Sequence, residues 1–480
     1  MAMMTMDRVA SPKGIGGAWE ARPIRRIGVL AAVTRQLRKG RPMTIRHPSH
    51  RRLAIGFVTS AALALALLDA APAGAGGLLL FEVGTSDVGL ASAGYTARAE
   101  DASTVFTNPA GMTRLDGTQL SLGGQLLYAD LGFSIGQGTA PALGDRSGGN
   151  PVGAFPGGGL FLSYSVAPDV RLGLAATGNF GLAQKYDSDW VGRYYVQEAT
   201  LIGMSLLPSV AWRVSKEVSV GASLNVMYGK LKQQVAVNNI VGSDGRLALD
   251  TYEWGYGANL GLLYEPNPTT RFGIVYNTQV KLDFSAPAEF SDLSPTLDAL
   301  LRARGLLNAT LDIPVYVPQG VNASFFHQLD DHWALLGSVG WQQWSKFGMV
   351  ELGVESNDPV TLTANLDFKD TWHVAGGARS RLNGPWLLNM GIAYDSGFQD
   401  GSNVVPALPA NSAWRFGLGL QNDERKNFSW SVSVEYLYGG TLDVNRSNAV
   451  PVPVGGRGNL VGSFDSVGMY FVAATFNWRL

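Results

Sequence analysis

Beyond residue 117, apolar and polar residues alternate position by position in one segment after another. In residues 218–228, valine, alanine, leucine and tyrosine occupy every second position, and serine, glycine and asparagine fill most positions between them. Residues 252–264 and 428–438 repeat this alternation with more aromatic residues on the apolar face. Because successive side chains of a strand point to opposite faces, the pattern predicts β-strands with one apolar and one polar face. The chain is therefore predicted to be all-β.

The composition helps to decide whether the apolar faces meet lipid or a buried core. Only 16% of residues are charged, against roughly 25% in an ordinary soluble domain. The alternating segments exceed the roughly 5–6 residues of a usual strand, and aromatic residues gather toward their ends, as in the interfacial girdles of membrane barrels. A soluble β-sandwich or propeller is the alternative. We predict a transmembrane β-barrel, since a helical membrane protein would need several apolar runs of about 20 residues.

Charge and side-chain chemistry exclude several classes of function. The net charge of −1 gives no electrostatic basis for binding nucleic acid. The chain has no cysteine, which excludes thiolate metal sites, and its five histidines lack metal-ligand spacing. No Gly-x-Ser-x-Gly or paired-histidine motif is present. We therefore predict that the protein is not an enzyme and needs no cofactor or metal.

Short polar turns alternate with longer loops along residues 118–480, the predicted barrel. Turns are expected near 167–169, 215–216, 266–268, 330–331, 383–384 and 422–423, and loops near 136–157, 183–196, 234–250, 286–313, 354–368, 399–411 and 441–464. In outer-membrane barrels the turns face the periplasm and the loops face outward. The pattern predicts fourteen antiparallel strands. Leucines at near-helical spacing in 286–313 predict a short amphipathic helix outside the membrane.

The C-terminal residues predict the closing strand of the barrel. Apolar residues occupy alternate positions from Tyr470 to Leu480. Outer-membrane proteins usually end in an aromatic residue, which is the signal for the barrel assembly machinery. The last residue here is Leu480, so we expect Phe476 and Trp478 to supply the aromatic contacts.

The N-terminal residues read as a targeting segment. Arginines precede an uncharged apolar stretch at 53–68, and small residues follow it. A basic region, a short apolar region and small residues near a cleavage site define a secretory signal. We predict a signal peptide at 43–75, cleaved after Ala75 or, as the alternative, after Ala73. Residues 1–42 are interpreted as a mis-called or disordered extension.

Residues 76–117 precede the first strand and do not alternate. They are rich in glycine and alanine, carry few charges, and include a run of apolar residues near 78–83. Such a segment either hangs in the periplasm or folds into the lumen of the barrel. Its low charge and apolar content favour burial in the lumen as a hatch.

Several motifs, in this order and spacing, resemble the long-chain fatty acid transporters of the Gram-negative outer membrane, the FadL-type family. They lie at residues 100–102, 108–112, 179–182, 189–195, 207–211, 261–266 and 344–347. The resemblance covers about residues 76–480. Any one of these motifs is weak evidence, but the ordered set behind a signal peptide is specific.

The resemblance implies a fourteen-stranded barrel with an N-terminal hatch in its lumen. It implies passive uptake of hydrophobic small molecules, most simply long-chain fatty acids, from a groove among the outer loops. Release is implied to be lateral, through a gap where the third strand of the barrel is kinked. A subgroup of the family carries aromatic hydrocarbons, which is the alternative substrate class, and a general diffusion porin is a second alternative.

The resemblance assigns hatch and gate residues to two places. Gly178 and Gly181, on either side of Phe180 in the third strand, would permit the kink. Asn108, Pro109 and Ala110 are expected where the hatch meets the barrel wall. The alternatives are two ordinary glycines among 60, and an ordinary Asn-Pro turn.

Five residues are candidates for ligand binding. Arg193 lies beside Trp190 and Tyr194 in a long loop, where it would either receive a carboxylate head group or hold the loop by an ion pair or cation–π contact. Lys230 and Lys369 match basic positions near the family's inner ligand site only loosely. Strict alternation would instead point Lys230 outward, toward lipid or lipopolysaccharide.

These observations predict a multi-pass barrel of the Gram-negative outer membrane. Its partners would be a hydrophobic ligand, outer-membrane lipid and lipopolysaccharide, and the barrel assembly machinery during folding. A monomer is expected, because a closed barrel has no free strand edges.

Overall fold

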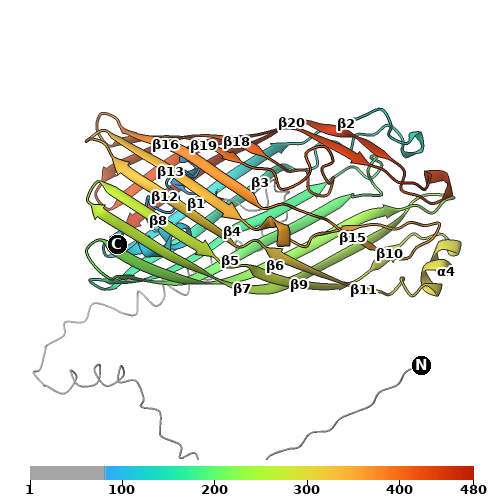
Figure 1. Ribbon diagram of the computed structural model, residues 1–480, viewed down its shortest axis with the longest axis horizontal. Coiled ribbons are helices and arrows are strands. Elements are labelled where there is room, and N and C mark those ends of the chain that lie inside the picture. Colours follow the sequence, from blue (N-terminus) through green and yellow to red (C-terminus); the bar gives the residue numbers. More distant parts are fainter. Residues whose placement is uncertain (1–80, 82) are drawn as a thin grey trace, which may run out of the picture. The chain divides into compact units, whose positions relative to one another are not determined.

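The computed structural model describes residue 81 and residues 83–480 (Figure 1). The predicted extension at 1–42 and the signal peptide at 43–75 lie outside these residues. No helix in the described part of the chain is long and apolar enough to cross a membrane.

Within residues 83–480, fourteen antiparallel strands form one closed sheet, as predicted. In ring order they are β1 (Thr118–Asp130), β3 (Gly153–Ala167), β4 (Val170–Lys185), β5 (Glu198–Arg213), β6 (Val218–Val237), β7 (Gly245–Asn267), β8 (Thr270–Asn277), β12 (Gly320–Gln328), β13 (Trp333–Gln342), β16 (Thr371–Arg381), β17 (Trp386–Asp395), β18 (Ala413–Arg425), β19 (Phe428–Arg446) and β20 (Leu460–Arg479). The last strand pairs with the first, from Gln119 opposite Arg479 to Asp130 opposite Gly468, and this pairing closes the barrel.

The barrel is apolar outside and polar inside across its central band. Leu224 and Trp254 are each 51% exposed, whereas Ser219, on the opposite face of β6, is 1% exposed. Aromatic side chains contact one another at two levels of the wall, in the pairs Tyr228–Trp254, Tyr394–Trp414 and Tyr436–Tyr470, and in the pairs Trp386–Trp430 and Phe428–Trp478. An exposed apolar band between aromatic girdles fits lipid and excludes the soluble β-sandwich.

Short and long connections alternate around the ring, so the barrel has a turn end and a loop end. The loop end carries β2 (Phe133–Ile135), η5 (Pro141–Leu143), β9 (Val280–Pro287), β10 (Glu289–Ser291), α4 (Pro295–Ala303), β11 (Thr310–Val317), η6 (Trp344–Lys346), β14 (Val350–Leu352), β15 (Thr363–Asn365) and η7 (Val452–Val454). Helix α4 confirms the predicted amphipathic helix, with Leu297 and Leu301 buried.

Several boundaries differ from the sequence-based expectation. The loops expected at 136–157 and 441–464 are partly strand, because β3 begins at Gly153, β19 runs to Arg446 and β20 begins at Leu460. The turn expected at 422–423 lies after Arg425, where β18 ends. Most of the loop expected at 234–250 is strand, because β6 runs to Val237 and β7 begins at Gly245. Past residue 230 the outward face of β6 becomes polar: Lys232 and Gln234 lie on it, whereas the apolar side chains Leu231, Val235 and Val237, together with Gln233, are buried. The strand therefore continues beyond the apolar band, where apolar outward positions no longer mark it.

The segment at 83–116 is almost entirely buried and touches two separate arcs of the ring. It contains η3 (Ser86–Leu90), α3 (Thr104–Thr107) and η4 (Pro109–Arg114). The first of these contacts strands β16 to β20, and η4 contacts β4 to β7. Glycines of the wall allow this close approach: a Cβ atom on Gly391 of β17 would overlap the Leu90 carbonyl group.

We predict that Gly391→Ala loosens the packing of residues 86–91 against the wall. Overpacking of this kind costs about 1–3 kcal/mol of folding free energy. Urea unfolding and limited proteolysis of the N-terminal segment, both in detergent, would measure the effect. Gly376→Ala is the matched control, because nothing lies within 4 Å of a Cβ at Gly376 on the neighbouring strand. Equal stability of the two variants would contradict the close packing.

Candidate functional site

The hydrogen-bonded ladder of the wall is interrupted between β3 and β4, and this interruption is here called the opening. The two strands pair from Ala167 opposite Val170 to Gly159 opposite Thr177, and no further pair joins them in the described structure. Residues 153–158 of β3 pair with β1, and residues 178–185 of β4 pair with β5. The chains meet again beyond the opening, where the Lys185 amide donates to the Pro151 carbonyl at 2.8 Å. A stretch of strand edge is therefore unpaired on each side.

A β-bulge in β4 lies where its pairing with β3 ends. Gly178 lies opposite Met204 and Phe180 lies opposite Gly203, so Asn179 is an extra residue between two regular pairs. An extra residue bends the bulged strand and disrupts its ladder. On the β3 side, Pro156 lacks an amide hydrogen, which suits a strand edge without a partner.

The predicted gate residues border this opening. Nothing lies within 4 Å of a Cβ at Gly178, whereas a Cβ at Gly181 would lie 3.3 Å from the Leu201 carbonyl oxygen. Phe180 points into the barrel, is 2% exposed, and packs edge-to-face on Phe347 with 6.1 Å between ring centroids. Its cluster of buried apolar side chains continues through Trp344 and Phe398 toward the loop end. The inner side of the opening is therefore apolar.

Asn108 joins the N-terminal segment to the wall. Its Nδ2 donates to the carbonyl oxygens of Thr96, at 2.7 Å, and of Leu262 in β7, at 3.0 Å. Its Oδ1 accepts from the Ala110 amide at 3.1 Å, which caps η4, while Pro109 occupies the first position of that helix. The predicted Asn-Pro-Ala triplet thus lies where the segment contacts β7.

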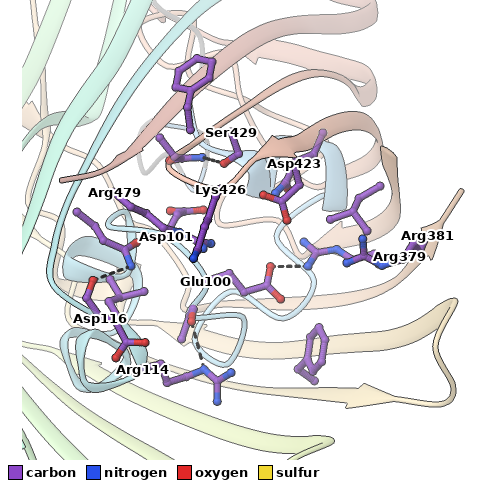
Figure 2. Close-up of a pocket in the computed structure, with 18 of the residues that line it drawn as sticks. Glu100, Asp101, Arg114, Asp116, Arg379, Arg381, Asp423, Lys426, Ser429 and Arg479 are labelled. Carbon is purple, nitrogen blue, oxygen red and sulfur yellow. Dashed lines mark hydrogen bonds and ion pairs between the residues drawn. The ribbon is translucent and has the colours of Figure 1, made fainter. Parts of the chain in front are cut away.

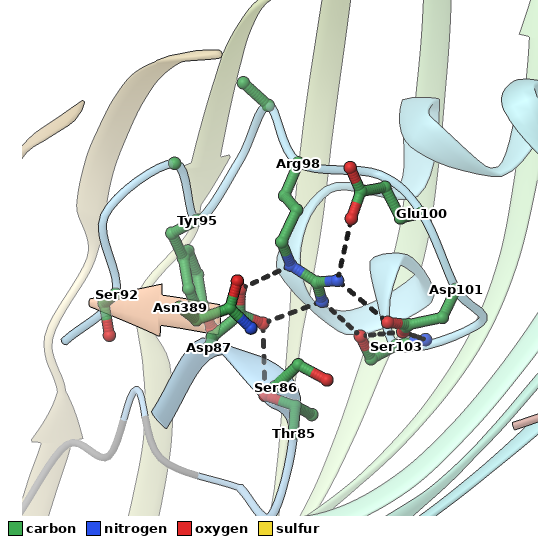
Figure 3. A network of polar contacts seen from close by, with 12 residues as sticks. Thr85, Ser86, Asp87, Ser92, Tyr95, Arg98, Glu100, Asp101, Ser103 and Asn389 are labelled. Carbon is green, nitrogen blue, oxygen red and sulfur yellow. Dashed lines mark hydrogen bonds and ion pairs between the residues drawn. The ribbon is translucent and has the colours of Figure 1, made fainter. Parts of the chain in front are cut away.

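A buried charge network, which the sequence reading missed, holds the same segment together (Figure 3). Arg98 pairs with Asp87 at 2.8 Å and with Asp101 at 2.9 Å. Glu100 contacts Arg98 at 3.7 Å and reaches two arginines of the wall, Arg271 and Arg379. Three charges within four residues, in a segment with few others, were the signal available in the sequence.

The network sets the ionisation of Glu100. Burial opposes ionisation, but the guanidinium groups of Arg379, Arg271 and Arg98 outweigh it and lower the pKa from 4.5 to about 2. A carboxyl group with a depressed folded-state pKa stabilises the fold above its unfolded pKa. This contribution is lost as the pH falls from about 4.5 toward 2.

We therefore predict that the urea midpoint of the wild-type protein falls between pH 4.5 and 2 by more than that of Glu100→Gln. The variant has no carboxyl group to protonate at this position, so its pH dependence is flatter in that window. At pH 7 the variant is less stable, because Arg271 and Arg379 lose their shared partner. Parallel curves for the two proteins would show that Glu100 does not hold the segment.

At the turn end, a cavity of about 350 Å³ is lined by charged side chains of both signs (Figure 2). The charged lining residues are Glu100, Asp101, Arg114, Asp116, Arg379, Arg381, Asp423, Lys426 and Arg479. Burying apolar groups against such a lining would leave charges unsolvated. The cavity does not suit a hydrophobic ligand.

The predicted ligand residues in the loop at 186–197 form a buried cluster. Trp190 stacks on Tyr186 at 3.9 Å between ring centroids. Arg193 pairs with Asp244 at 2.7 Å and lies over the Tyr194 ring. The Tyr194 hydroxyl donates to the Asp244 carboxylate at 2.6 Å. Of the two roles considered for Arg193, the structure displays the ion pair.

The two candidate lysines lie apart from this cluster. Lys230 is on the outward face of β6, opposite Tyr252 of β7, with its Nζ 3.5 Å from Asp250. Lys369 is exposed in the connection before β16, where its amide donates to the Phe398 carbonyl. The structure therefore does not bring the five candidates together as one binding site.

A closed barrel with a lipid-facing exterior, a filled lumen and an opening in its wall defines an outer-membrane transport barrel. The comparisons with known proteins agree. Residues 66–479 match the model of the family described as outer membrane protein transport protein (OMPP1/FadL/TodX). The chain belongs to this family.

Similar proteins extend over nearly the same length. The chain is 26% identical to the long-chain fatty acid transport protein of Escherichia coli K12, over 81% of this chain and 93% of that one. It is 30% identical to the 47 kDa outer membrane protein of Pasteurella multocida, over 84% and 96%. Among solved structures, a FadL homologue of Pseudomonas aeruginosa covers 84% of this chain and 99% of its own, with a TM-score of 0.72 and 19% identity. The Pseudomonas putida toluene transporter TodX covers 83% and 99%, with a TM-score of 0.59 and 15% identity.

Proposed function

We propose that this transporter takes up long-chain fatty acids passively and releases them sideways into the membrane between β3 and β4. The observation that carries the proposal is the end of β3–β4 pairing at Gly159 and Thr177. In lipid, unpaired backbone groups are costly, and a closed barrel avoids them. Because unpaired backbone is unfavourable in lipid, we infer that the opening has a function. It leads from an apolar interior to the membrane, so an apolar solute is the ligand that it suits.

The two ends of the lumen support a lateral rather than an axial exit. Residues 83–116 fill the lumen as the hatch, tied to the wall through Asn108 and Glu100. The cavity at the turn end is lined by charges. A hydrophobic ligand that enters from the loop end therefore meets an apolar route at Phe180 and a polar one beneath the hatch.

Fatty acids are the first candidate because curated relatives of similar length are long-chain fatty acid transport proteins. One observation favours aromatic hydrocarbons as a second candidate. Three arginines toward the loop end, Arg193, Arg415 and Arg457, are each already paired with a carboxylate. A neutral ligand would need none of these cations, whereas a fatty acid would have to compete for one.

The remaining partners follow from the barrel itself. Lys230 and Lys232 lie on the outward face just past Tyr228, where lipopolysaccharide head groups would lie. Since the wall closes on itself, we propose that the protein is a monomer in the membrane. Its final strand, β20, is the part that we expect the assembly machinery to recognise.

We predict that deletion of Asn179 abolishes uptake. Removal of the extra residue would join the Gly178–Met204 pair directly to the Phe180–Gly203 pair, and the Phe180 side chain would keep its present face. The straightened strand could then continue its ladder with β3. Uptake of labelled oleate by cells lacking their own transporter should fall to background, at unchanged surface abundance. Asn179→Ala, which keeps the bulge, is the control and should retain uptake.

The same cells would decide the substrate class. If the chain carries fatty acids, labelled oleate accumulates faster than in empty-vector cells, and unlabelled oleate competes for uptake. Labelled toluene taken up without oleate would move the protein to the hydrocarbon carriers. Passage of small sugars without either compound would contradict the proposed function.

A further inference from the structure

The connection between β17 and β18, residues 396–412, folds over the loop end and is here called the strap. Gln399 staples it internally: its Nε2 donates to the Leu408 and Ala410 carbonyls at 2.6 and 2.8 Å, and its Oε1 accepts from the Val405 amide at 3.0 Å. The Val404 amide donates to the Asp443 carbonyl of β19 at 2.7 Å. The strap is thus held together by its own hydrogen bonds and is attached to β19, the neighbour of β18 in the ring.

The tip of the strap is held by a distant strand. The Pro406 carbonyl oxygen accepts from Gln184 Nε2 at 2.8 Å and from the Tyr186 hydroxyl at 3.0 Å. Gln184 belongs to β4, and β19, β20, β1 and β3 separate β4 from β18 in the ring. The strap therefore reaches across the mouth to the strand that borders the lateral opening.

Gln184 lies on the stretch of β4 that has no partner in β3. Four hydrogen bonds hold the loop-side end of this edge: the Lys185–Pro151 bond, the bond from the Asp187 amide to the Gly148 carbonyl at 3.1 Å, and the two bonds to Pro406. Gln184 is buried and its Oε1 has no hydrogen-bond partner, so the bond to Pro406 is what orients its amide. Tyr186 is held in place by stacking on Trp190.

We propose that Gln184 and Tyr186 are positioning residues that tie the strap to the unpaired edge of β4, so that lifting the strap and widening the lateral opening are one motion. When the tip lifts, both donors lose their acceptor and the edge of β4 loses its contact across the mouth. Entry at the loop end and exit through the wall are then linked. The role of this coupled motion in transport rests on the proposed function, whereas the coupling between the strap and the edge of β4 does not.

Two buried alanines can report this motion separately. Ala407 in the strap and Ala183 on β4 are each 5% exposed. Because the chain contains no cysteine, Ala407→Cys and Ala183→Cys give single-thiol proteins. Their rates of reaction with a maleimide, in detergent and without ligand, measure the population in which each position is open. A wild-type background should give slow labelling at both.

In the double variant Gln184→Leu with Tyr186→Phe, labelling should be about tenfold faster at both reporters, as expected for the loss of two buried hydrogen bonds of ordinary strength. Tyr195→Phe is the matched control, since the Tyr195 hydroxyl also donates to a loop carbonyl, that of Gly458, at 2.6 Å. It should leave both rates unchanged. A rise at Ala407→Cys alone would overturn the coupling, and no rise at either position would overturn the tie itself.

A conservative variant separates positioning from general packing. In Gln184→Glu, an ionised carboxylate cannot donate to the Pro406 carbonyl, but the protonated acid can. Burial raises the pKa of a carboxyl group, so labelling at Ala407→Cys, normalised to the unfolded chain, should stay near the wild-type rate while the introduced carboxyl group is protonated and become faster as it ionises between about pH 5 and 9. Normalised rates that stay high and equal across this range would contradict the positioning role. Since no ligand is present, failure of lateral transport would leave this result standing.

Discussion

The satisfaction of backbone hydrogen bonds in lipid is the constraint on which the rest of this structure depends. The wall meets it by closing β20 onto β1, so that the first and last strands of the sheet become neighbours. Where β3–β4 pairing ends, β4 carries one extra residue and the facing strand carries a proline. The position of this opening, beside the apolar side of the lumen, connects the fold to transport.

Inside the barrel, buried polar and charged groups are likewise paired. The segment at 83–116 is buried, and Arg98, Glu100 and Asn108 pair its polar groups with one another and with the wall. The turn end is therefore polar, and the interior behind Phe180 is apolar. This division is consistent with the lateral release that we propose. The strap adds a link between the mouth and the same opening.

Much of the fold was predictable because lipid leaves a period-two pattern on every strand that crosses it. The fourteen strands follow from that pattern, and α4 follows from leucines at near-helical spacing. The outer halves of β6 and β7 were not recognised, because the outward face of β6 becomes polar beyond residue 230. Gly178 and Gly181 came from the family resemblance, whereas the bulge at Asn179 depends on register with β5, which one strand cannot reveal. The partner of Arg193 is Asp244, a contact between two loops that no local spacing encodes.

The proposed exit route of the ligand runs through the wall between β3 and β4. The most direct measurement is photo-crosslinking with a diazirine-labelled fatty acid in outer-membrane vesicles, followed by mass spectrometry of the modified residues. The account predicts adducts on residues 153–158 and 178–184, which border the opening. Adducts confined to the hatch and to the turn-end cavity around Arg381 and Lys426 would show an axial exit and contradict the account.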